Sequence, residues 1–387
     1  MSKLERLIQQ YCPDGVEYVK LDSVANICRG TRVVKSQLSD KGFPVYQNCL
    51  TPMGYFERSN CNAGITFVIC GGAAGNVGYT DVECWAADDC EFIIGNHQVI
   101  NRYIYYYLMT KQNYLLSKVR KASIPRLSPS IIKDLEIPVP PLPVQEEIVR
   151  ILDTFTELQA ELQAELQKRQ QQYNFYRDNL LNFNRGGQEI KWMKLKDVAI
   201  QWYRGAGIKR DEVGKEGTPC IRYGEIHTTY NIWFKKCISH TDEHKQATKK
   251  YAEYGDILFA ITSEDIPLVG NSVAYLGKEK ILVGGDIVVM KHNQDPKYMA
   301  YALSTSDAIK QKGKGKVKSK VVHTNVPSLQ EIVIPIPPIE EQQRIANILD
   351  RFDTLTNDLS SGLPAEMEKR RQQYEYYRDR LLTFKRL

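Results

Sequence analysis

The chain of 387 residues is 42% hydrophobic and 25% charged, the balance of a soluble globular protein with room for two or three domains. Its apolar runs fall short of the roughly 20 residues that span a bilayer, and its first residues lack the apolar core of a signal peptide. The sequence therefore argues against a membrane or secreted protein and predicts a cytoplasmic one. The net charge of +6 is small for this length, so charge clustering says more about partners than the total does.

The chain has nine cysteines, an odd number, and no two of them form a CxxC pair. Seven lie in the first half of the chain and two in the second, although the two halves otherwise repeat each other. Zinc ligands need closer spacing than this, so we expect reduced thiols and no metal site.

Residues 1–136 have the pattern of a mixed domain of short strands and turns. Val16–Ala25 opens it, and Gly64–Thr80 combines a β-rich apolar run with a glycine turn. Arg102–Val119 then has apolar and aromatic residues three and four positions apart, which predicts a helix.

A Pro-rich entry and a helical pattern follow, and both occur twice in the chain. The first copy reads IPVPPLPVQEEIVRILDTF from Ile137, and the second reads IPIPPIEEQQRIANILDRF from Ile334. The copies also end alike, in YNFYRDNLLNF and YEYYRDRLLTF. Proline cannot continue a helix, so each helix should begin just after its entry.

The second mixed domain repeats the order of the first with little sequence identity. Its opening, Ile190–Ala199, resembles Val16–Ala25, and a helix around Tyr298 and Tyr301 corresponds to the first tyrosine-rich helix. The chain is therefore predicted to alternate two mixed domains with two spacers, at residues 1–136, 137–188, 189–333 and 334–387.

Apolar residues in each spacer step by three and four, which is a coiled-coil seam. The seam positions are Ile148, Ile151, Phe155, Leu158 and Leu162 in the first spacer, and Ile345, Ile348, Phe352, Leu355 and Leu359 in the second. In the first spacer an eleven-residue step leads to Tyr173, which a continuous helix can absorb. In the second, Gly362 and Pro364 should end one helix, and Pro364 can stand in the first turn of the next.

The middle of the first spacer holds a short tandem repeat, QAEL at Gln159–Leu162 and again at Gln163–Leu166. Its composition alone fits an ordinary helix. Its place between two domains favours a second interpretation, a ruler in which each unit adds about 6 Å of helix.

Basic residues cluster between the tyrosine-rich helix and the Pro-rich entry of each half. Alternating lysines and two glycines in the second half predict a flexible loop that contacts phosphate. The expected phosphate contacts are Lys118, Arg120, Lys121 and Arg126 in the first domain, and Lys310, Lys312, Lys314, Lys316, Lys318 and Lys320 in the second.

Side chains that can pair with base edges from loops are candidates for base readout. These are Arg29, Arg32, Tyr46, Gln47 and Asn48 in the first domain, and Arg204, Arg210, Arg222 and Tyr223 in the second.

Three local motifs suggest other chemistry, and we set each aside. Gly71–Gly78 is glycine-rich but lacks the Lys-Ser/Thr of a P-loop. His240–His244 matches an H-x-x-E-H zinc motif but lies in a polar run without a helical apolar face. Glu189–Lys191 is a tripeptide common by chance, and methyltransferase motifs are absent, so catalysis should belong to partners.

The whole chain resembles the specificity subunit of type I restriction-modification systems. The resemblance rests on Cys12–Leu21, the two Pro-rich entries that end at Gln145 and Gln342, the Ile-Leu-Asp after each, and the YRDxLLxF tails. It implies an α+β fold in which two target-recognition domains alternate with two helical spacers. The spacers would pair as an antiparallel coiled coil about an internal pseudo-two-fold axis.

The resemblance also implies a non-catalytic DNA-binding subunit that reads a bipartite duplex target and positions two methyltransferase subunits, which restriction subunits join. S-adenosylmethionine, ATP and Mg would be bound by the partners, and no cofactor by this chain. The spacer residues expected to carry pairing and partner docking are Gln145, Ile148, Ile151, Phe155, Leu158, Leu162, Tyr176, Gln342, Ile345, Ile348, Phe352, Leu355, Leu359 and Tyr377.

Two alternatives remain open from the residues alone: a DNA methyltransferase or nuclease with degenerate motifs, and a coiled-coil scaffold without a DNA function. The bases read by each half and the gap between the halves depend on loop conformation, which the sequence does not specify.

Overall fold

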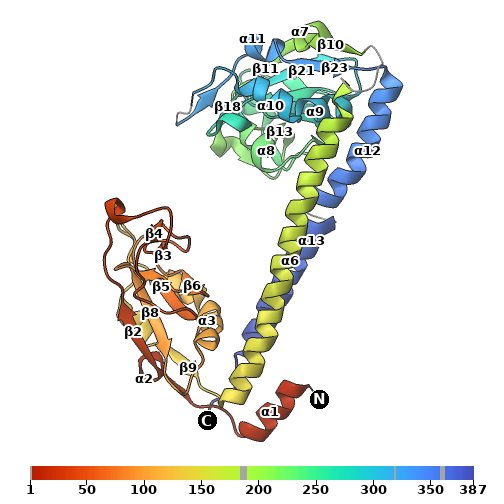
Figure 1. Ribbon diagram of the computed structural model, residues 1–387. Coiled ribbons are helices and arrows are strands. Elements are labelled where there is room, and N and C mark those ends of the chain that lie inside the picture. Colours follow the sequence, from red (N-terminus) through yellow and green to blue (C-terminus); the bar gives the residue numbers. More distant parts are fainter. Residues whose placement is uncertain (1, 184–189, 318–319, 358–361) are drawn as a thin grey trace. The chain divides into compact units, whose positions relative to one another are not determined.

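The computed structural model describes the chain apart from residues 1, 184–189, 318–319 and 358–361 (Figure 1). It forms two compact units, one of Met1–Leu162 with Met367–Leu387 and one of Gln163–Glu366. Each unit combines one mixed domain with parts of both spacers, and the fold is α+β.

In its described residues, unit 1 contains nine short strands. They are β1 (Tyr18–Lys20), β2 (Ala25–Arg29), β3 (Phe43–Tyr46), β4 (Tyr55–Phe56), β5 (Ile65–Ile69), β6 (Val77–Thr80), β7 (Trp85–Ala86), β8 (Cys90–Gly95) and β9 (Glu136–Pro138). Its helices are α1 (Lys3–Tyr11), α2 (Leu21–Val24), α3 (Asn101–Thr110), α4 (Gln112–Ser117) and α5 (Pro129–Lys133), with a 3-10 turn at Lys35–Gln37.

The core of unit 1 is a four-stranded antiparallel sheet in the order β2-β8-β5-β6. The central strand β5 is buried along its whole length, and its side chains alternate between two apolar clusters. Val68 packs in the cluster that includes α3, whereas Phe67 and Ile69 pack on the other face. A continuous apolar run is what a strand covered on both faces requires.

The tyrosine-rich segment is two helices instead of the single helix predicted. The chain turns at Lys111, between α3 and α4. This turn lets the Gln112 amide donate to the Gly75 carbonyl (2.6 Å) and accept from the Val77 N–H (3.1 Å). The break therefore ties the helical layer to the turn between β5 and β6.

Unit 2 contains fourteen strands in the part of the chain that the structure describes. They are β10 (Lys191–Lys194), β11 (Ala199–Arg204), β12 (Val213–Gly214), β13 (Thr218–Ile221), β14 (Trp233–Phe234), β15 (Ser239–Thr241), β16 (Tyr251–Ala252), β17 (Ile257–Ala260), β18 (Thr262–Ser263), β19 (Ser272–Tyr275), β20 (Ile281–Val283), β21 (Ile287–His292), β22 (Val322–His323) and β23 (Val333–Ile336). Its shorter helices are α7 (Leu195–Val198), α8 (Tyr223–Thr228), α9 (Pro296–Leu303), α10 (Ser306–Gly313) and α11 (Val326–Gln330), with 3-10 turns at Arg210–Glu212, Glu243–Lys245 and Ile266–Leu268.

The sheets of unit 2 repeat those of unit 1, which confirms the predicted repetition of the two domains. The order β11-β21-β17-β19 matches β2-β8-β5-β6, with β14 added at the edge. The pair β10-β23 matches β1-β9, and both pairs are antiparallel. The helix α9 contains Tyr298 and Tyr301, as predicted, and both side chains are fully buried.

The spacers are the helices α6 (Leu142–Leu180), α12 (Ile339–Asn357) and α13 (Gly362–Leu381) (Figure 1). The helix α6 is continuous over 39 residues, as the eleven-residue step predicts. In the second spacer, α12 and α13 are separate helices, and Pro364 stands in the first turn of α13 as expected.

Each Pro-rich entry has two parts. Ile137 and Ile334 are strand residues of β9 and β23, so each entry starts inside a sheet of its mixed domain. The entry is not wholly non-helical, because α6 begins at Leu142 with Pro143 second. Proline is tolerated there, since the first N–H groups of a helix have no partner within the helix.

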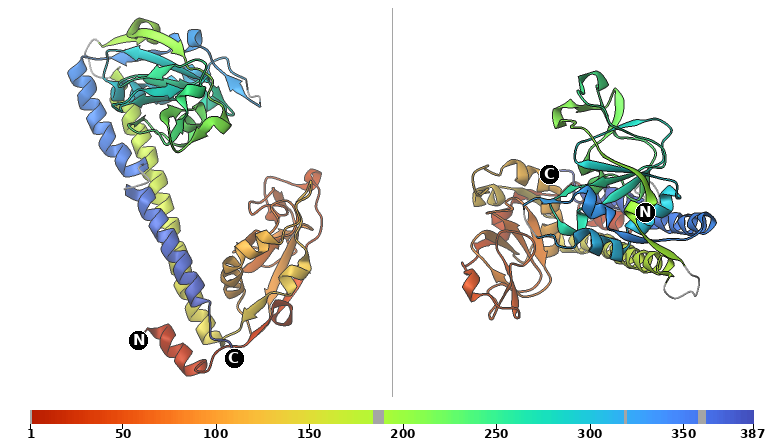
Figure 2. Two further views of the ribbon diagram at one scale, coloured as in Figure 1. Left: turned by 180° about the vertical axis from the view of Figure 1, so that it is seen from behind. Right: turned by 90° about the horizontal axis from the view of Figure 1, so that it is seen from above.

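The segments at the two ends of the chain come together in unit 1, beside the N-terminal end of α6 (Figure 2). The Val16 N–H donates to the Lys385 carbonyl (2.8 Å), and the Leu387 N–H donates to the Val16 carbonyl (3.2 Å). The Tyr18 hydroxyl donates to the Phe384 carbonyl (3.1 Å). The tail of the second spacer is therefore part of the first structural unit.

Candidate functional site

The basic segment of the first domain is a hairpin. Arg120 and Arg126 exchange main-chain hydrogen bonds of 2.8 and 3.2 Å, and Gly71 pairs with Arg126 next to the end of β5. The side chains of Lys118, Arg120 and Lys121 are exposed or partly exposed. Arg126 forms an ion pair with Asp89 (2.6 Å), which offsets part of its charge. The first three side chains therefore remain the ones available to an anionic partner.

The basic segment of the second domain is not wholly a flexible loop, and one of its lysines is buried. Lys310 and Lys312 belong to α10. The Lys312 ammonium donates to the Leu303 carbonyl (2.8 Å) and the Ser272 hydroxyl (3.3 Å), and burial lowers its pKa to about 7. The run of alternating lysines, which suggested a loop, begins inside α10, where the Lys312 side chain faces the core.

The other predicted lysines of this segment stay candidates for phosphate contact. Lys310, Lys314 and Lys320 are exposed, Lys316 is half-buried, and Lys318 lies outside the described residues. The described part of the segment thus provides fewer accessible cations than the sequence suggests.

The recurring Arg-Gly pair of the two domains has a packing reason. A Cβ on Gly30 would lie 2.3 Å from the Ala86 carbonyl oxygen, and one on Gly205 would lie 2.2 Å from that of Gly284. Both glycines therefore allow a close main-chain approach. The arginine before each one also bonds a carbonyl, since Arg29 donates to Asp88 (2.8 Å) and Arg204 to Gly285.

The base-readout candidates differ in how exposed their side chains are. Tyr46 packs its ring on Phe67 of β5, with 4.9 Å between the ring centroids, and therefore supports the sheet. Partial burial raises the pKa of its hydroxyl. Gln47, Arg222 and Tyr223 are half-buried. Arg29, Arg32, Asn48, Arg204 and Arg210 are exposed, and Arg204 also pairs with Asp286 (2.9 Å). The exposed arginines and Asn48 are therefore the most accessible candidates.

Gln145, expected to dock partners, is instead buried inside unit 1. Its side-chain oxygen accepts from the Ile100 N–H (3.0 Å), and its nitrogen donates to the carbonyls of Gln98 (2.8 Å) and Pro140 (2.7 Å). Ile100 is the residue that caps the start of α3. Gln145 therefore joins the spacer to its own domain and leaves no group for a partner.

Gln342 is likewise buried in unit 2 and is not available to a partner. Its oxygen accepts from the N–H of Asp295 (3.0 Å), which caps α9, and its nitrogen donates to Gln294 and to the Pro337 carbonyl, both at 2.8 Å. The repeated glutamine is thus a structural residue in both copies.

The buried stripe of the spacers differs from the predicted seam at several positions. Ile148 and Ile345 are buried as expected, but Leu152 and Leu349 are fully buried where Ile151 and Ile348 are half-buried. The helices pack on a mixed domain as well as on each other, so the buried stripe is wider than a coiled-coil seam. Leu158 is exposed and Leu162 half-buried, and neither the Leu355 side chain nor Leu359 lies in the described part.

Two aromatic stacks join the spacers, one in each unit. In unit 1, Phe155 stacks on Tyr377 with ring centroids 5.7 Å apart and planes at 22°. In unit 2, Phe352 stacks on Tyr176 at 5.9 Å and 21°. Phe155 and Phe352 are equivalent residues of the two copies, as are Tyr176 and Tyr377. Each copy therefore gives a phenylalanine to one stack and a tyrosine to the other.

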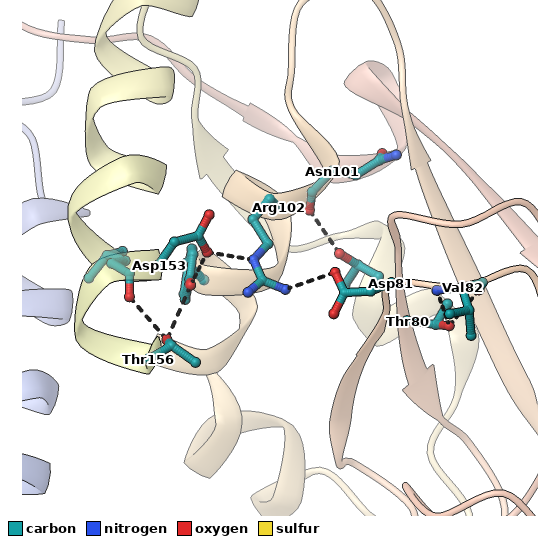
Figure 3. A network of polar contacts seen from close by, with 10 residues as sticks. Thr80, Asp81, Val82, Asn101, Arg102, Asp153 and Thr156 are labelled. Carbon is teal, nitrogen blue, oxygen red and sulfur yellow. Dashed lines mark hydrogen bonds and ion pairs between the residues drawn. The ribbon is translucent and has the colours of Figure 1, made fainter. Parts of the chain in front are cut away.

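In each unit, one aspartate that the sequence analysis did not list as a site residue joins the mixed domain to its spacer helix. In unit 1, Asp153 accepts from the Tyr106 hydroxyl (2.5 Å) and the Arg102 Nε (2.8 Å) (Figure 3). In unit 2, Asp350 accepts from the Tyr301 hydroxyl (2.7 Å) and forms an ion pair with Lys297. The available signal was the Ile-Leu-Asp that recurs after each entry.

Neither a metal centre nor a membrane span is found in the described ranges. No group of three or more His, Cys, Asp or Glu residues there could hold a metal ion. Outside the gaps in the structure, no helix is both long and apolar enough to cross a membrane. Gly71–Gly78 covers the turn after β5 and the first two residues of β6, and His240–His244 spans the end of β15 and a 3-10 turn.

Comparison with known proteins identifies the family. The family model for the type I restriction modification DNA specificity domain matches residues 13–169 and 188–369. A putative type I restriction enzyme specificity subunit of Haemophilus influenzae is 30% identical over 98% of both chains. The EcoR124I/EcoR124II specificity subunit of Escherichia coli is 33% identical over 75% of this chain and 72% of its own.

Two solved structures share the fold. A type I restriction-modification S subunit from M. genitalium gives a TM-score of 0.53 at 16% identity, covering 95% of this chain and 96% of that one. A chain from a study of complex assembly and conformational transition in the type I R-M system gives 0.61 at 14% identity, covering 96% and 98%. The family match sets aside the enzyme and scaffold alternatives. The chain belongs to the type I restriction-modification specificity subunits, and its role is DNA sequence specificity without catalysis.

Proposed function

We propose that this subunit reads a bipartite DNA target, one half with each mixed domain, and that its spacers pair as an antiparallel coiled coil about a pseudo-two-fold axis. The exchanged stacks carry the proposal: Phe155 with Tyr377, and Phe352 with Tyr176. A reciprocal exchange between equivalent residues is the mark of a two-fold interface, in which residue i contacts j and j contacts i.

Such an axis gives one chain the DNA geometry of a homodimer. Two domains related by a two-fold axis face opposite strands, and the distance between them sets the spacing of the half-sites. The helix α6, with 39 residues, is roughly 58 Å long, which exceeds the ~34 Å of one turn of DNA. The spacer is long enough to hold two domains on separate half-sites.

The basic segments supply the sequence-independent part of binding. Lys118, Arg120 and Lys121 on the first hairpin, and Lys314 and Lys320 in the second domain, are suited to phosphate contact. Arg32, Arg210 and Asn48 are exposed candidates for base edges, because arginine can donate two bonds to guanine and asparagine can pair with adenine.

Partner docking is assigned to two equivalent exposed aromatic pairs. Phe175 and Tyr176 pack edge to face at 5.6 Å, and Tyr376 and Tyr377 do so at 5.4 Å. Phe175 is 65% exposed and Tyr376 is 60% exposed. Exposed aromatic residues are frequent anchors of protein interfaces. Two equivalent pairs suit two copies of one methyltransferase subunit, which restriction subunits then join.

The cofactors of the assembled enzyme belong to those partners in this proposal. S-adenosylmethionine would be bound by the methyltransferase subunits, and ATP and Mg would serve the partners' reactions. The specificity subunit contributes DNA recognition and placement.

The test is to co-express the chain with its methyltransferase subunits and map methylated adenines across the host genome. A motif of two short defined sequences separated by a fixed undefined gap is expected. Exchanging the second mixed domain for that of a relative should change one half only. A single uninterrupted motif, or a change in both halves after the exchange, would refute bipartite reading.

A further inference from the structure

Each mixed domain meets its spacer helix at a repeated carboxylate junction. We name Asp153 with Arg102 and Tyr106 the first junction, and Asp350 with Lys297 and Tyr301 the second. In both, the cation and the tyrosine are four residues apart on one helix, α3 or α9. Residues at this spacing share a helix face, so both side chains reach the same carboxylate.

The first junction extends from the spacer into the sheet (Figure 3). Arg102 bonds Asp153 on α6 with its Nε, and its Nη1 lies 3.8 Å from Asp81, just after β6. Its guanidinium also lies 4.3 Å from the centre of the Tyr79 ring. Only about a fifth of the Arg102 side chain is exposed. Arg102 and Asp153 are both partly buried, so their charge-assisted hydrogen bond is screened less than a fully exposed pair and has a defined geometry.

The second junction uses different side chains on the domain but the same carboxylate on the spacer. The Trp233 indole on β14 donates to Asp350 (2.9 Å), and the Lys297 ammonium lies 4.5 Å from the centre of the Trp233 ring. Asp350 thus receives a hydroxyl, an indole N–H and a cation. The sheet is again connected to the spacer through one carboxylate.

The junctions add polar contacts to each attachment, beyond its strand entry and buried glutamine and beside the apolar packing of Leu152 or Leu349. The chain enters each spacer through the β9 or β23 strand, and the buried glutamine fixes the start of α3 or α9 against the entry. Both contacts lie near one end of the helix. The aspartate lies eight residues further along the spacer, which is about 12 Å in a helix. Two polar attachment points separated along an axis restrain tilt with defined geometry, which apolar packing alone specifies less well.

We propose that Asp153 and Asp350 are positioning residues: each sets the tilt of its domain on the spacer, and together they fix the gap at which the two half-sites are accepted. This inference rests on the bipartite reading proposed above. The two aspartates hold the geometry in which DNA is read, and they contact the domain rather than the DNA.

The experiment measures methylation by the reconstituted complex on duplexes whose gap is one base pair shorter than, equal to, or one longer than the preferred gap. The variants are Asp153→Ala, Asp350→Ala and the double substitution, with Asp153→Asn and Asp350→Asn as milder versions. We expect the rate ratio between the preferred gap and its neighbours to fall at least threefold for each alanine variant. The half-site sequences should stay the same.

Two controls separate positioning from loss of stability. Glu161→Gln removes an exposed carboxylate from the same helix and should change nothing. Tyr103→Phe removes a buried hydroxyl that donates to the Pro138 carbonyl (3.1 Å) within the domain. It should lower the melting temperature without relaxing gap preference. Arg102→Lys, which gives the first junction the cation of the second, should retain the preference.

A second measurement does not depend on DNA. Spin labels introduced through an unnatural amino acid at Lys41 and Glu157 report the distance between the first domain and α6. We expect Asp153→Ala to broaden this distance distribution and Tyr103→Phe to leave it unchanged. An unchanged distribution together with an unchanged gap ratio would overturn the proposal. If the unmodified complex showed no gap preference, bipartite reading would fail, while the label distances would still decide the role of Asp153.

Discussion

At the scale of single residues, buried polar side chains connect the sequence repeat to the architecture. Gln145 and Gln342 occupy equivalent positions and make equivalent bonds, each to the capping residue of a tyrosine-bearing helix. A buried amide with all its partners satisfied specifies one arrangement, because any other leaves its groups unpaired. The repetition of these glutamines therefore reflects structural need in both units.

Replacing Gln145 by alanine should destabilise the protein measurably. The Ile100 N–H and the Pro140 carbonyl would lose their buried partner, which costs about 1–3 kcal/mol. Thermal or denaturant unfolding would show this loss. Gln171→Ala, at an exposed position of the same helix, should be neutral within error. Equal stability of the two variants would contradict the structural role of Gln145.

Lys312 predicts a specific pH dependence of stability. Burial lowers its pKa in the folded protein from 10.5 to about 7. Below about pH 7 both states are protonated, so stability does not vary through this group. Between about pH 7 and 10.5 only the unfolded state holds the proton, so the free energy of unfolding rises with pH.

Lys312→Met should remove that rise. Relative to the variant, the unmodified protein should gain up to about 4 kcal/mol between pH 7 and pH 10. Chemical denaturation at several pH values measures the difference. Lys310→Met changes an exposed lysine of the same helix and should give a pH profile parallel to that of the unmodified protein. Parallel profiles for Lys312→Met would show that Lys312 does not titrate in this range.

At the scale of elements, α6 carries the tandem QAEL repeat within an unbroken helix. The Leu166 side chain at the end of the second repeat is buried, and Leu162 at the end of the first is half-buried. Four residues are close to one helical turn, so losing one repeat shortens the helix and keeps the apolar stripe on roughly the same face.

Deleting Gln163–Leu166 should therefore shorten the preferred gap between half-sites by one to two base pairs, on the order of the ~6 Å removed from the helix. Methylation mapping before and after the deletion measures this. Duplicating the repeat should lengthen the gap by a similar amount. A changed half-site sequence with an unchanged gap would contradict the ruler.

The basic segments give a prediction about salt. Changing Lys314, Lys316 and Lys320 to glutamine should weaken binding to all DNA sequences similarly. The slope of log affinity against log salt should fall by about 0.9 for each DNA phosphate that a lysine no longer neutralises. Titrations at several salt concentrations measure it. Lys168→Gln, an exposed lysine on α6, is the matched control. An unchanged slope would remove these lysines from the DNA interface.

At the scale of the whole molecule, the duplicated architecture could be predicted because the repeated residues are largely the ones that pack in the spacers. The seam at Ile148 and Ile345, the continuous α6 and the division between α12 and α13 all follow from spacing and proline chemistry. The carboxylate junctions were missed because Asp153 gains its meaning only when α3 lies against α6, and its partner Arg102 is about fifty positions away in the sequence. Lys312 was wrongly predicted to contact phosphate for the same reason, because a run of lysines does not show which side chain is buried by tertiary packing.

The discontinuity of unit 1 has a consequence for synthesis on the ribosome. Gln163–Glu366 emerges as one uninterrupted stretch, but unit 1 needs Met367–Leu387 to complete it. At ~5–20 residues per second, the nascent first domain waits on the order of ten to forty seconds for those residues. During that time Phe155 lacks its Tyr377 neighbour, and Val16 lacks its main-chain partners at Lys385 and Leu387. The part of the protein made first is thus the last to be finished, and an unfinished first unit is the form most exposed to chaperones and proteases.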